Sequence, residues 1–140
     1  SNCELLASSD ADGTLKLWTF PASAGTSTAA QCTLTKPRSA SKQVRFQPSG
    51  SLLAAGIDSA VNIFDLSAEC TIQLLTGHQK AVTSVAWSSA AELLATASDD
   101  TLRIWDLKSP SKSACIRSLS LLSRYYAVAF HPTCSTIILG

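Results

Sequence analysis

Apolar and polar residues alternate in short runs along most of this chain, and Gly, Pro, Ser or Asp bounds each run. The pattern is clearest between residues 77 and 106, where the runs 82–87, 93–98 and 102–106 follow one another. Runs of this length, rich in β-branched and aromatic side chains and separated by turn residues, predict short antiparallel strands. No segment has a convincing helical period, so we expect an all-β fold.

The same order of runs recurs along the chain, which predicts a repeat protein. Aromatic residues that close the first strand of a unit lie 41 and 43 residues apart, and those that close the third strand lie 46 and 41 apart. A period of roughly 40 to 45 residues is typical of four-stranded propeller blades. The first set is Phe46, Trp87 and Phe130, and the second is Trp18, Phe64 and Trp105.

We divide the single domain, residues 1–140, into units at 4–35, 43–75, 82–119 and 126–140. A flexible loop is expected at 20–31, because Pro, Ala, Ser, Gly and Thr replace the strand pattern from Pro21 to Ala30. An interdomain linker is the alternative, but the repeat resumes directly at Cys32. The units amount to about three blades, too few to close a ring, so we expect the remaining blades to come from other parts of the same protein or from other chains.

Two dipeptides frame the third unit. Gly77-His78 precedes its first strand, and Trp105-Asp106 closes its third. This combination resembles the WD repeat, one blade of a β-propeller. The expected fold is therefore an all-β WD-repeat β-propeller, partial, with about three four-stranded antiparallel blades, which starts and ends inside a blade.

The WD resemblance implies a buried hydrogen-bond network among the turn His, a Ser or Thr at the end of the second strand, an Asp in the following turn and the Trp of the third strand. A satisfied network of this kind fixes the blade. The spacing leaves open which of two adjacent aspartates joins the His. The second unit has Lys36-Pro37-Arg38 in place of Gly-His, so we expect its network to be incomplete and its blade less rigid. The predicted network residues are His78, Ser98, Asp99, Asp100, Trp105, Asp12, Trp18 and Asp58.

The same side-chain types could indicate a hydrolase, but no G-x-S-x-G elbow or oxyanion signature accompanies them, so we expect no enzyme and no catalytic residue. The two histidines, His78 and His131, have no Cys, His or Asp partner at metal-ligand spacing. No phosphate-binding Gly-rich loop precedes a helix. We therefore expect neither a metal nor a cofactor.

Composition limits the classes of partner. Hydrophobic residues make up 46% of the chain and charged residues 15%, with a net charge of +1, so no global charge attracts nucleic acid or a membrane. No apolar run approaches the roughly 18 residues of a membrane span. The five cysteines form no C-x-x-C pair, which favours reduced, packed thiols of an intracellular protein. Three of them open the fourth strands in phase and are expected in the core: Cys32, Cys70 and Cys115.

A narrower resemblance covers the chain from about Gln43 onward. This part of the chain is similar to the C-terminal WD repeats of the LEUNIG family of plant transcriptional corepressors. This implies a nuclear, Groucho-like corepressor that other proteins recruit to DNA and that passes repression to Mediator and histone-deacetylase machinery. The matching segments are 43–48, 53–55, 61–65, 75–78, 84–87, 94–98, 103–105 and 130–132.

Propellers of this family are expected to bind through the loops that join a fourth strand to the next first strand and a second strand to a third. The first kind of loop has a repeated basic character here, which favours an acidic or phosphorylated peptide. Ordinary solubilising loop charges are the alternative. The candidate partner-binding residues are Arg38, Lys42, Gln79, Lys80, Arg124 and Tyr125.

The sequence therefore predicts a protein-interaction scaffold in transcription-factor or corepressor complexes, without direct binding to nucleic acid or membrane. The alternative is a WD-repeat scaffold of another pathway, such as ubiquitin-ligase substrate recognition or RNA-processing assembly.

Overall fold

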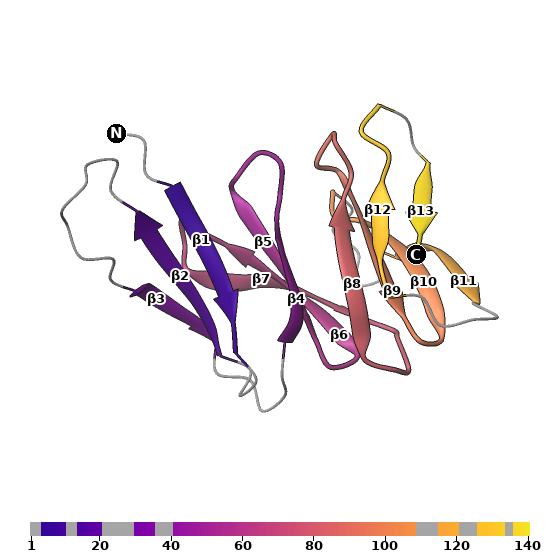
Figure 1. The fold of residues 1–140 in the computed structure, drawn as a ribbon, viewed down its shortest axis with the longest axis horizontal. Helices are drawn as coiled ribbons and strands as arrows, with labels where there is room; N and C mark the ends of the chain where they lie inside the picture. The colour runs from indigo at the N-terminus through magenta and orange to yellow at the C-terminus, as the bar shows by residue number, and fades with distance from the viewer. Residues whose placement is uncertain are drawn as a thin grey trace.

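The computed structural model describes residues 4–10, 14–20, 30–35, 41–108, 115–120, 126–133 and 136–140. Every regular element in these ranges is a β-strand (Figure 1). None of the described segments is a helix long and apolar enough to cross a membrane. The strands are β1 (Glu4–Ser9), β2 (Leu15–Phe20), β3 (Ala30–Thr35), β4 (Ser41–Phe46), β5 (Leu52–Ile57), β6 (Ala60–Asp65), β7 (Cys70–Thr76), β8 (Val82–Trp87), β9 (Leu93–Ser98), β10 (Thr101–Asp106), β11 (Cys115–Ser120), β12 (Val128–Phe130) and β13 (Ile137–Leu139).

The strands form four antiparallel sheets that follow one another in chain order. The first sheet is β1-β2-β3, the second β4-β5-β6-β7, the third β8-β9-β10-β11 and the fourth β12-β13. Figure 1 shows them side by side from the indigo N-terminal strands to the yellow C-terminal strands. The sheets are the blades of a β-propeller, and the all-β prediction is confirmed.

The two complete sheets share one register. In the second sheet, Leu53 of β5 pairs with Phe46 on one side and Phe64 on the other. In the third sheet, Leu94 of β9 pairs in the same way with Trp87 and Trp105. The aromatic spacing read from the sequence therefore corresponds to equivalent positions in consecutive blades.

The core lies between the sheets. Leu15 and Leu17 of the first sheet pack in one cluster with Phe64 of the second. Ile63 on the opposite face of the second sheet packs in another cluster with Trp105 of the third. A third cluster joins the third and fourth sheets. Because both faces of an inner sheet are covered, β5 and β9 are buried over five consecutive residues each instead of alternating.

Two expectations need correction at the strand ends. Phe20 lies in β2, and Ala30 and Gln31 lie in β3, so the predicted loop 20–31 is too long at both ends, and its interior, 21–29, lies outside the described residues. Ala30 is held by pairing with Trp18, a contact that composition alone does not reveal.

The in-phase cysteines do not form a buried row. Cys70 is exposed and Cys115 is half-buried, because β7 and β11 are the outer strands of their sheets. Cys32 is the third residue of β3 and not its first.

Candidate functional site

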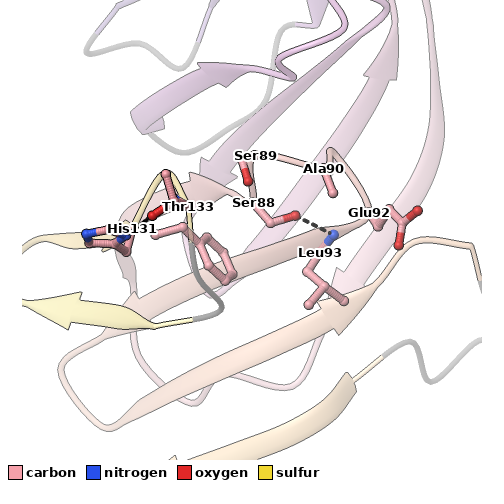
Figure 2. A pocket seen from close by; sticks show the side chains of 8 residues that line it. Ser88, Ser89, Ala90, Glu92, Leu93, His131 and Thr133 are labelled. Carbon is pink, nitrogen blue, oxygen red and sulfur yellow. Dashed lines mark hydrogen bonds between the residues drawn. The ribbon is translucent and has the colours of Figure 1, made fainter.

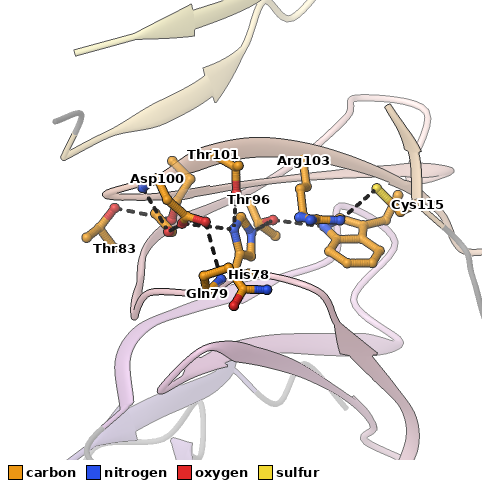
Figure 3. A network of polar contacts seen from close by, with 11 residues as sticks. His78, Gln79, Thr83, Thr96, Asp100, Thr101, Arg103 and Cys115 are labelled. Carbon is orange, nitrogen blue, oxygen red and sulfur yellow. Dashed lines mark hydrogen bonds and ion pairs between the residues drawn. The ribbon is translucent and has the colours of Figure 1, made fainter. Parts of the chain in front are cut away.

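His78 is the centre of a polar network between the second and third sheets (Figure 3). The turn after β7 places its imidazole beside β9 and β10, where the residue is 5% exposed. Nε2 lies 2.7 Å from Thr96 Oγ1, and Nδ1 lies 2.8 Å from Thr101 Oγ1. Trp105 Nε1 donates to the same Thr96 Oγ1 at 2.8 Å. The Thr96 hydroxyl therefore joins the imidazole to the indole.

One order of donors satisfies all of these atoms. Thr96 Oγ1 accepts from the indole N–H, so its own hydroxyl proton can be donated to His78 Nε2. Nδ1–H then donates toward Thr101 Oγ1, and the Asp100 carboxylate, 3.9 Å from Nδ1, favours the proton on that nitrogen. This order requires a neutral imidazole.

Burial agrees with the neutral form. Desolvation lowers the pKa of His78 from 6.5 to about 4, and it outweighs the opposing attraction of the Asp100 carboxylate. Arg103, whose guanidinium lies 5.9 Å from the centre of the Trp105 ring, adds a smaller effect in the same direction as burial.

Asp100 is the aspartate that approaches His78. The Ser98 hydroxyl donates to its Oδ1, and the backbone N–H of Gln79 donates to its Oδ2 at 3.3 Å. Partial burial raises the pKa of this carboxyl, but the hydrogen bonds outweigh it and hold the pKa below the usual value. Asp100 thereby ties the turn before β8 to the turn between β9 and β10.

Thr96 and Thr101 were missed by the sequence reasoning, which placed the hydroxyl of the network on Ser98. Ser98 bonds Asp100, whereas Thr96, two residues earlier, bonds both His78 and Trp105. The signal that could have found Thr96 is the pairing register: it lies two residues after Leu94, the partner of Trp105 across the β9–β10 pair. Side chains two residues apart on a strand point to the same face.

The equivalent positions in the other sheets follow the same rule. In the first sheet, Trp18 pairs with Leu6, and its Nε1 donates to Ser8 Oγ at 2.8 Å. In the second sheet, Phe64 pairs with Leu53, so the rule selects Ala55, two residues after Leu53, and both Ala55 and Phe64 are fully buried. The second sheet therefore has an apolar pair where its neighbours have a hydroxyl and an indole.

The remaining predicted network residues do not contact His78 or lie outside the described residues. Asp58 occupies the β5–β6 turn with φ 52° and an exposed side chain, and its backbone carbonyl accepts from Val82 N at 2.7 Å. Asp99 is half-buried in the β9–β10 turn. Asp12 lies outside the described residues.

The predicted partner-binding residues are only partly described. Gln79 and Lys80 are exposed in the turn that leads into β8, and Lys42 lies in β4. Arg38, Arg124 and Tyr125 lie outside the described residues. The Asp58 turn lies at the same end of the sheets, because its carbonyl bonds the first residue of β8. The described part of this edge therefore carries both signs of charge.

The His78 network stabilises the third sheet and does not provide a catalytic pair. The imidazole contacts two threonine hydroxyls and is enclosed, and the Ser98 hydroxyl is committed to Asp100, so His78 and Ser98 do not form a nucleophile and base pair. Across the described ranges, no group of three His, Cys, Asp or Glu side chains is placed to hold a metal.

Comparison with known proteins places these features in a family. Residues 1–19 and 69–106 match the family described as "WD domain, G-beta repeat". A solved structure, the crystal structure of the Myceliophteria_thermophila Cps50 (Swd1) beta-propeller domain, superposes with a TM-score of 0.65 and 28% sequence identity. The match covers 71% of this chain and 32% of that chain.

Two relatives extend the comparison. "Transcriptional corepressor LEUNIG_HOMOLOG" of Arabidopsis thaliana is 35% identical over 133 residues, which are 93% of this chain and 15% of the relative. "Pre-mRNA-processing factor 19" of Bos taurus is 40% identical over 68 residues, which are 48% of this chain and 14% of the relative. The chain thus spans a small part of either relative.

Proposed function

This chain belongs to the WD-repeat family, and from that premise we propose that it is a non-enzymatic protein-interaction scaffold that forms part of a LEUNIG-like transcriptional corepressor. The observation that carries the proposal is 35% identity to a transcriptional corepressor over 93% of the chain. Nuclear localisation is part of the same proposal.

The polar network supports a scaffold over an enzyme. The side chains that resemble catalytic groups are hydrogen-bonded to one another, and they fix the turn before β8 to the strands β9 and β10 of the third sheet. Recognition is then left to the exposed loops, which can vary without disturbing the blades.

The proposed contact surface is the set of loops that lead into the first strand of each blade. In the described part, Gln79 and Lys80 are exposed there, and the Gln79 backbone is fixed by Asp100. Asp100 is turned toward the protein by this bond and by Ser98, so its charge is partly satisfied internally, whereas Lys80 is free to meet solvent. Together with Arg38, Arg124 and Tyr125, and with Lys42 at the start of β4, this favours an acidic or phosphorylated segment of a partner protein.

The test is a pull-down of transcription-factor and corepressor complexes on the 140-residue chain, with Arg38, Lys80 and Arg124 each replaced by Glu. We expect captured partner to fall at least about tenfold, since reversing three contact charges costs more than the roughly 1.4 kcal/mol that corresponds to tenfold. The control reverses three cations outside these loops, Lys16, Arg45 and Arg117, and should retain binding. Equal capture by both variants would disprove the basic contact surface.

A scaffold in RNA-processing assembly is the second candidate, because the similarity to a pre-mRNA-processing factor covers almost half of the chain. The two candidates separate in one assay. Tethering the chain to a reporter promoter should reduce transcription if it is a corepressor part, and should leave transcription unchanged if it belongs to RNA processing.

A further inference from the structure

Cys115, the first residue of β11, lies beside the guanidinium of Arg103 on β10 (Figure 3). Arg103 Nη1 donates to Cys115 Sγ at 3.6 Å, and the thiol donates to the backbone carbonyl of Arg117 at 3.4 Å. The cysteine is free and half-buried. Its sulfur is therefore held by two partners and is still partly accessible to a small molecule.

The guanidinium of Arg103 has hydrogen-bonding capacity that the described residues do not use. Its Nε is buried and has no hydrogen-bond partner among them. Both ion pairs within the described ranges, His78 with Asp100 and Lys108 with Glu92, leave Arg103 out. A guanidinium donates five hydrogen bonds and accepts none, and a buried donor without a partner costs free energy. An oxygen atom added beside this group would therefore be stabilised as an acceptor.

The surroundings of Arg103 keep the guanidinium next to the sulfur. On one side its Cζ lies 5.9 Å from the centre of the Trp105 ring. On another side it rests against the turn before β8, because a Cβ added at Gly77 would lie 2.7 Å from Nη1. Donors that are already in place stabilise a developing charge without the cost of reorganisation.

We propose that Cys115 is a site of reversible oxidation by hydrogen peroxide, and that Arg103 binds the oxygen that the sulfur acquires. The sulfur attacks one peroxide oxygen, an S–O bond forms, and the O–O bond breaks. The hydroxide that departs leaves with the thiol proton as water, so the sulfur is oxidised by two electrons to sulfenic acid. Arg103 donates to the oxygens on which negative charge develops. The site does not depend on which partner the scaffold binds.

Cys70 provides a comparison within the same chain. It is the first residue of β7, as Cys115 is of β11, and it is free and exposed. Its partner across the β6–β7 pair is Asp65, whereas the partner of Cys115 across the β10–β11 pair is Trp105. A nearby carboxylate opposes the negative charge that peroxide attack develops. Exposure alone would make Cys70 the faster thiol, whereas the neighbouring groups make Cys115 the faster one.

The test treats the reduced 140-residue chain with hydrogen peroxide and traps sulfenic acid with dimedone. Trypsin places the two thiols in separate peptides, 46–80 and 113–117, which mass spectrometry quantifies. We expect the adduct at Cys115 to form about tenfold faster than at Cys70, the difference that one charge-assisted hydrogen bond can produce. Dithiothreitol added before dimedone should abolish the adduct. Equal rates, or a faster reaction at Cys70, would overturn the proposal.

Replacing Arg103 tests its role directly. In Arg103→Gln the adduct at Cys115 should form more slowly than at Cys70, because the half-buried thiol has lost its cation. Unfolding of the variant would instead make the two rates equal, since both thiols would be fully exposed, and thermal unfolding is measured alongside. Arg117→Gln is the matched control: this exposed arginine on the same strand contacts the thiol only through its backbone carbonyl, so the rates should not change. A folded Arg103→Gln with the original rates would contradict the proposal.

The Gly77 amide reports whether Arg103 binds the new oxygen, because the guanidinium rests against Gly77. In the ¹⁵N-labelled chain, peroxide should shift this amide, and Cys115→Ser should abolish the shift. Ser89 and Ala90 are the reference, since they line a cavity of about 220 Å³ between the β8–β9 and β12–β13 turns, on the side of the third sheet that faces the fourth (Figure 2). They should respond identically in both proteins. A Gly77 shift that persists in Cys115→Ser, or no shift at all, would overturn the role of Arg103.

Discussion

The hydroxyl oxygen of Thr96 joins β9 to Trp105 of β10 and to His78 of the turn before β8. It accepts the indole proton of Trp105 and contacts His78 Nε2, and the residue is fully buried. Removing this hydroxyl leaves an indole N–H and an imidazole nitrogen without their partner in a place that water does not reach. Buried polar groups without partners are costly.

We therefore expect Thr96→Val to lower the free energy of unfolding by about 1–3 kcal/mol, although its shape is nearly unchanged. The measurement is urea denaturation followed by tryptophan fluorescence. Thr96→Ser, which keeps the hydroxyl, should cost clearly less. If both variants lose the same stability, the methyl group matters and the hydrogen bonds do not.

At this scale the sequence predicts His78 and Trp105 well and the hydroxyl between them poorly. His78 and Trp105 stand in recognisable dipeptides, but the choice between Thr96 and Ser98 depends on which strand residue lies opposite Trp105. Both residues have the same chemistry and lie on the same face, so only the register distinguishes them. The same limit applies to Asp99 and Asp100, which differ only in the geometry of the β9–β10 turn.

Among the elements, the contact between the second and third sheets depends on a residue without a side chain. A Cβ added at Gly56 would lie 2.9 Å from Cγ1 and 3.2 Å from Cβ of Val82. Val82 is itself buried, on the first strand of the next sheet, and its branched side chain has little freedom to turn away. Gly56 thus permits β5 and β8 to approach closely.

Gly56→Ala should destabilise the protein by about 1–3 kcal/mol, the usual range for an overpacked core. The double variant Gly56→Ala/Val82→Ala should lose less than the sum of the two single variants, because the smaller partner makes room. Thermal unfolding of the four proteins of this cycle gives the result. Additive losses would mean that the two residues do not press on each other.

The elements themselves were predictable because their pattern repeats. Aromatic closing residues and turn residues located the strands of the two complete blades to within a few residues. The outer strands were harder: β7 and β11 carry exposed residues such as Ile72 and Ile116, so apolar character there does not signal burial. An expectation of buried cysteines on these strands was wrong for that reason.

For the whole molecule, the buried imidazole makes stability depend on pH above the range where carboxylates titrate. The folded state holds the pKa of His78 at about 4, below its ordinary 6.5, so the unfolded state binds the extra proton first as the pH falls. Stability is full above pH 6.5 and declines toward pH 4, by on the order of 3 kcal/mol for this one group.

Below pH 4 a second decline should follow. Hydrogen bonds from the Ser67 hydroxyl and from the backbone N–H groups of the next residues lower the pKa of Asp65, and the pKa of Asp100 is also lowered. Both carboxylates therefore resist protonation in the folded state, and the stabilisation they provide is lost as they titrate.

Urea unfolding at intervals from pH 7 to pH 4, with the His78 ring followed by NMR, checks the first decline, which comes from His78. Protonation of the folded His78 ring near pH 6.5 would contradict it.

The apolar pair in the second sheet has an evolutionary consequence. Ala55 and Phe64 occupy the positions that hold a hydroxyl and an indole in the neighbouring blades. Starting from this pair, Phe64→Trp alone would bury an N–H with no acceptor, and Ala55→Thr alone would bury a hydroxyl with no indole to meet it. Each single step is penalised, and only the joint exchange restores a matched pair. The two sites are therefore epistatic, and the difference between adjacent blades can persist over long divergence because no easy one-step path leads from one state to the other.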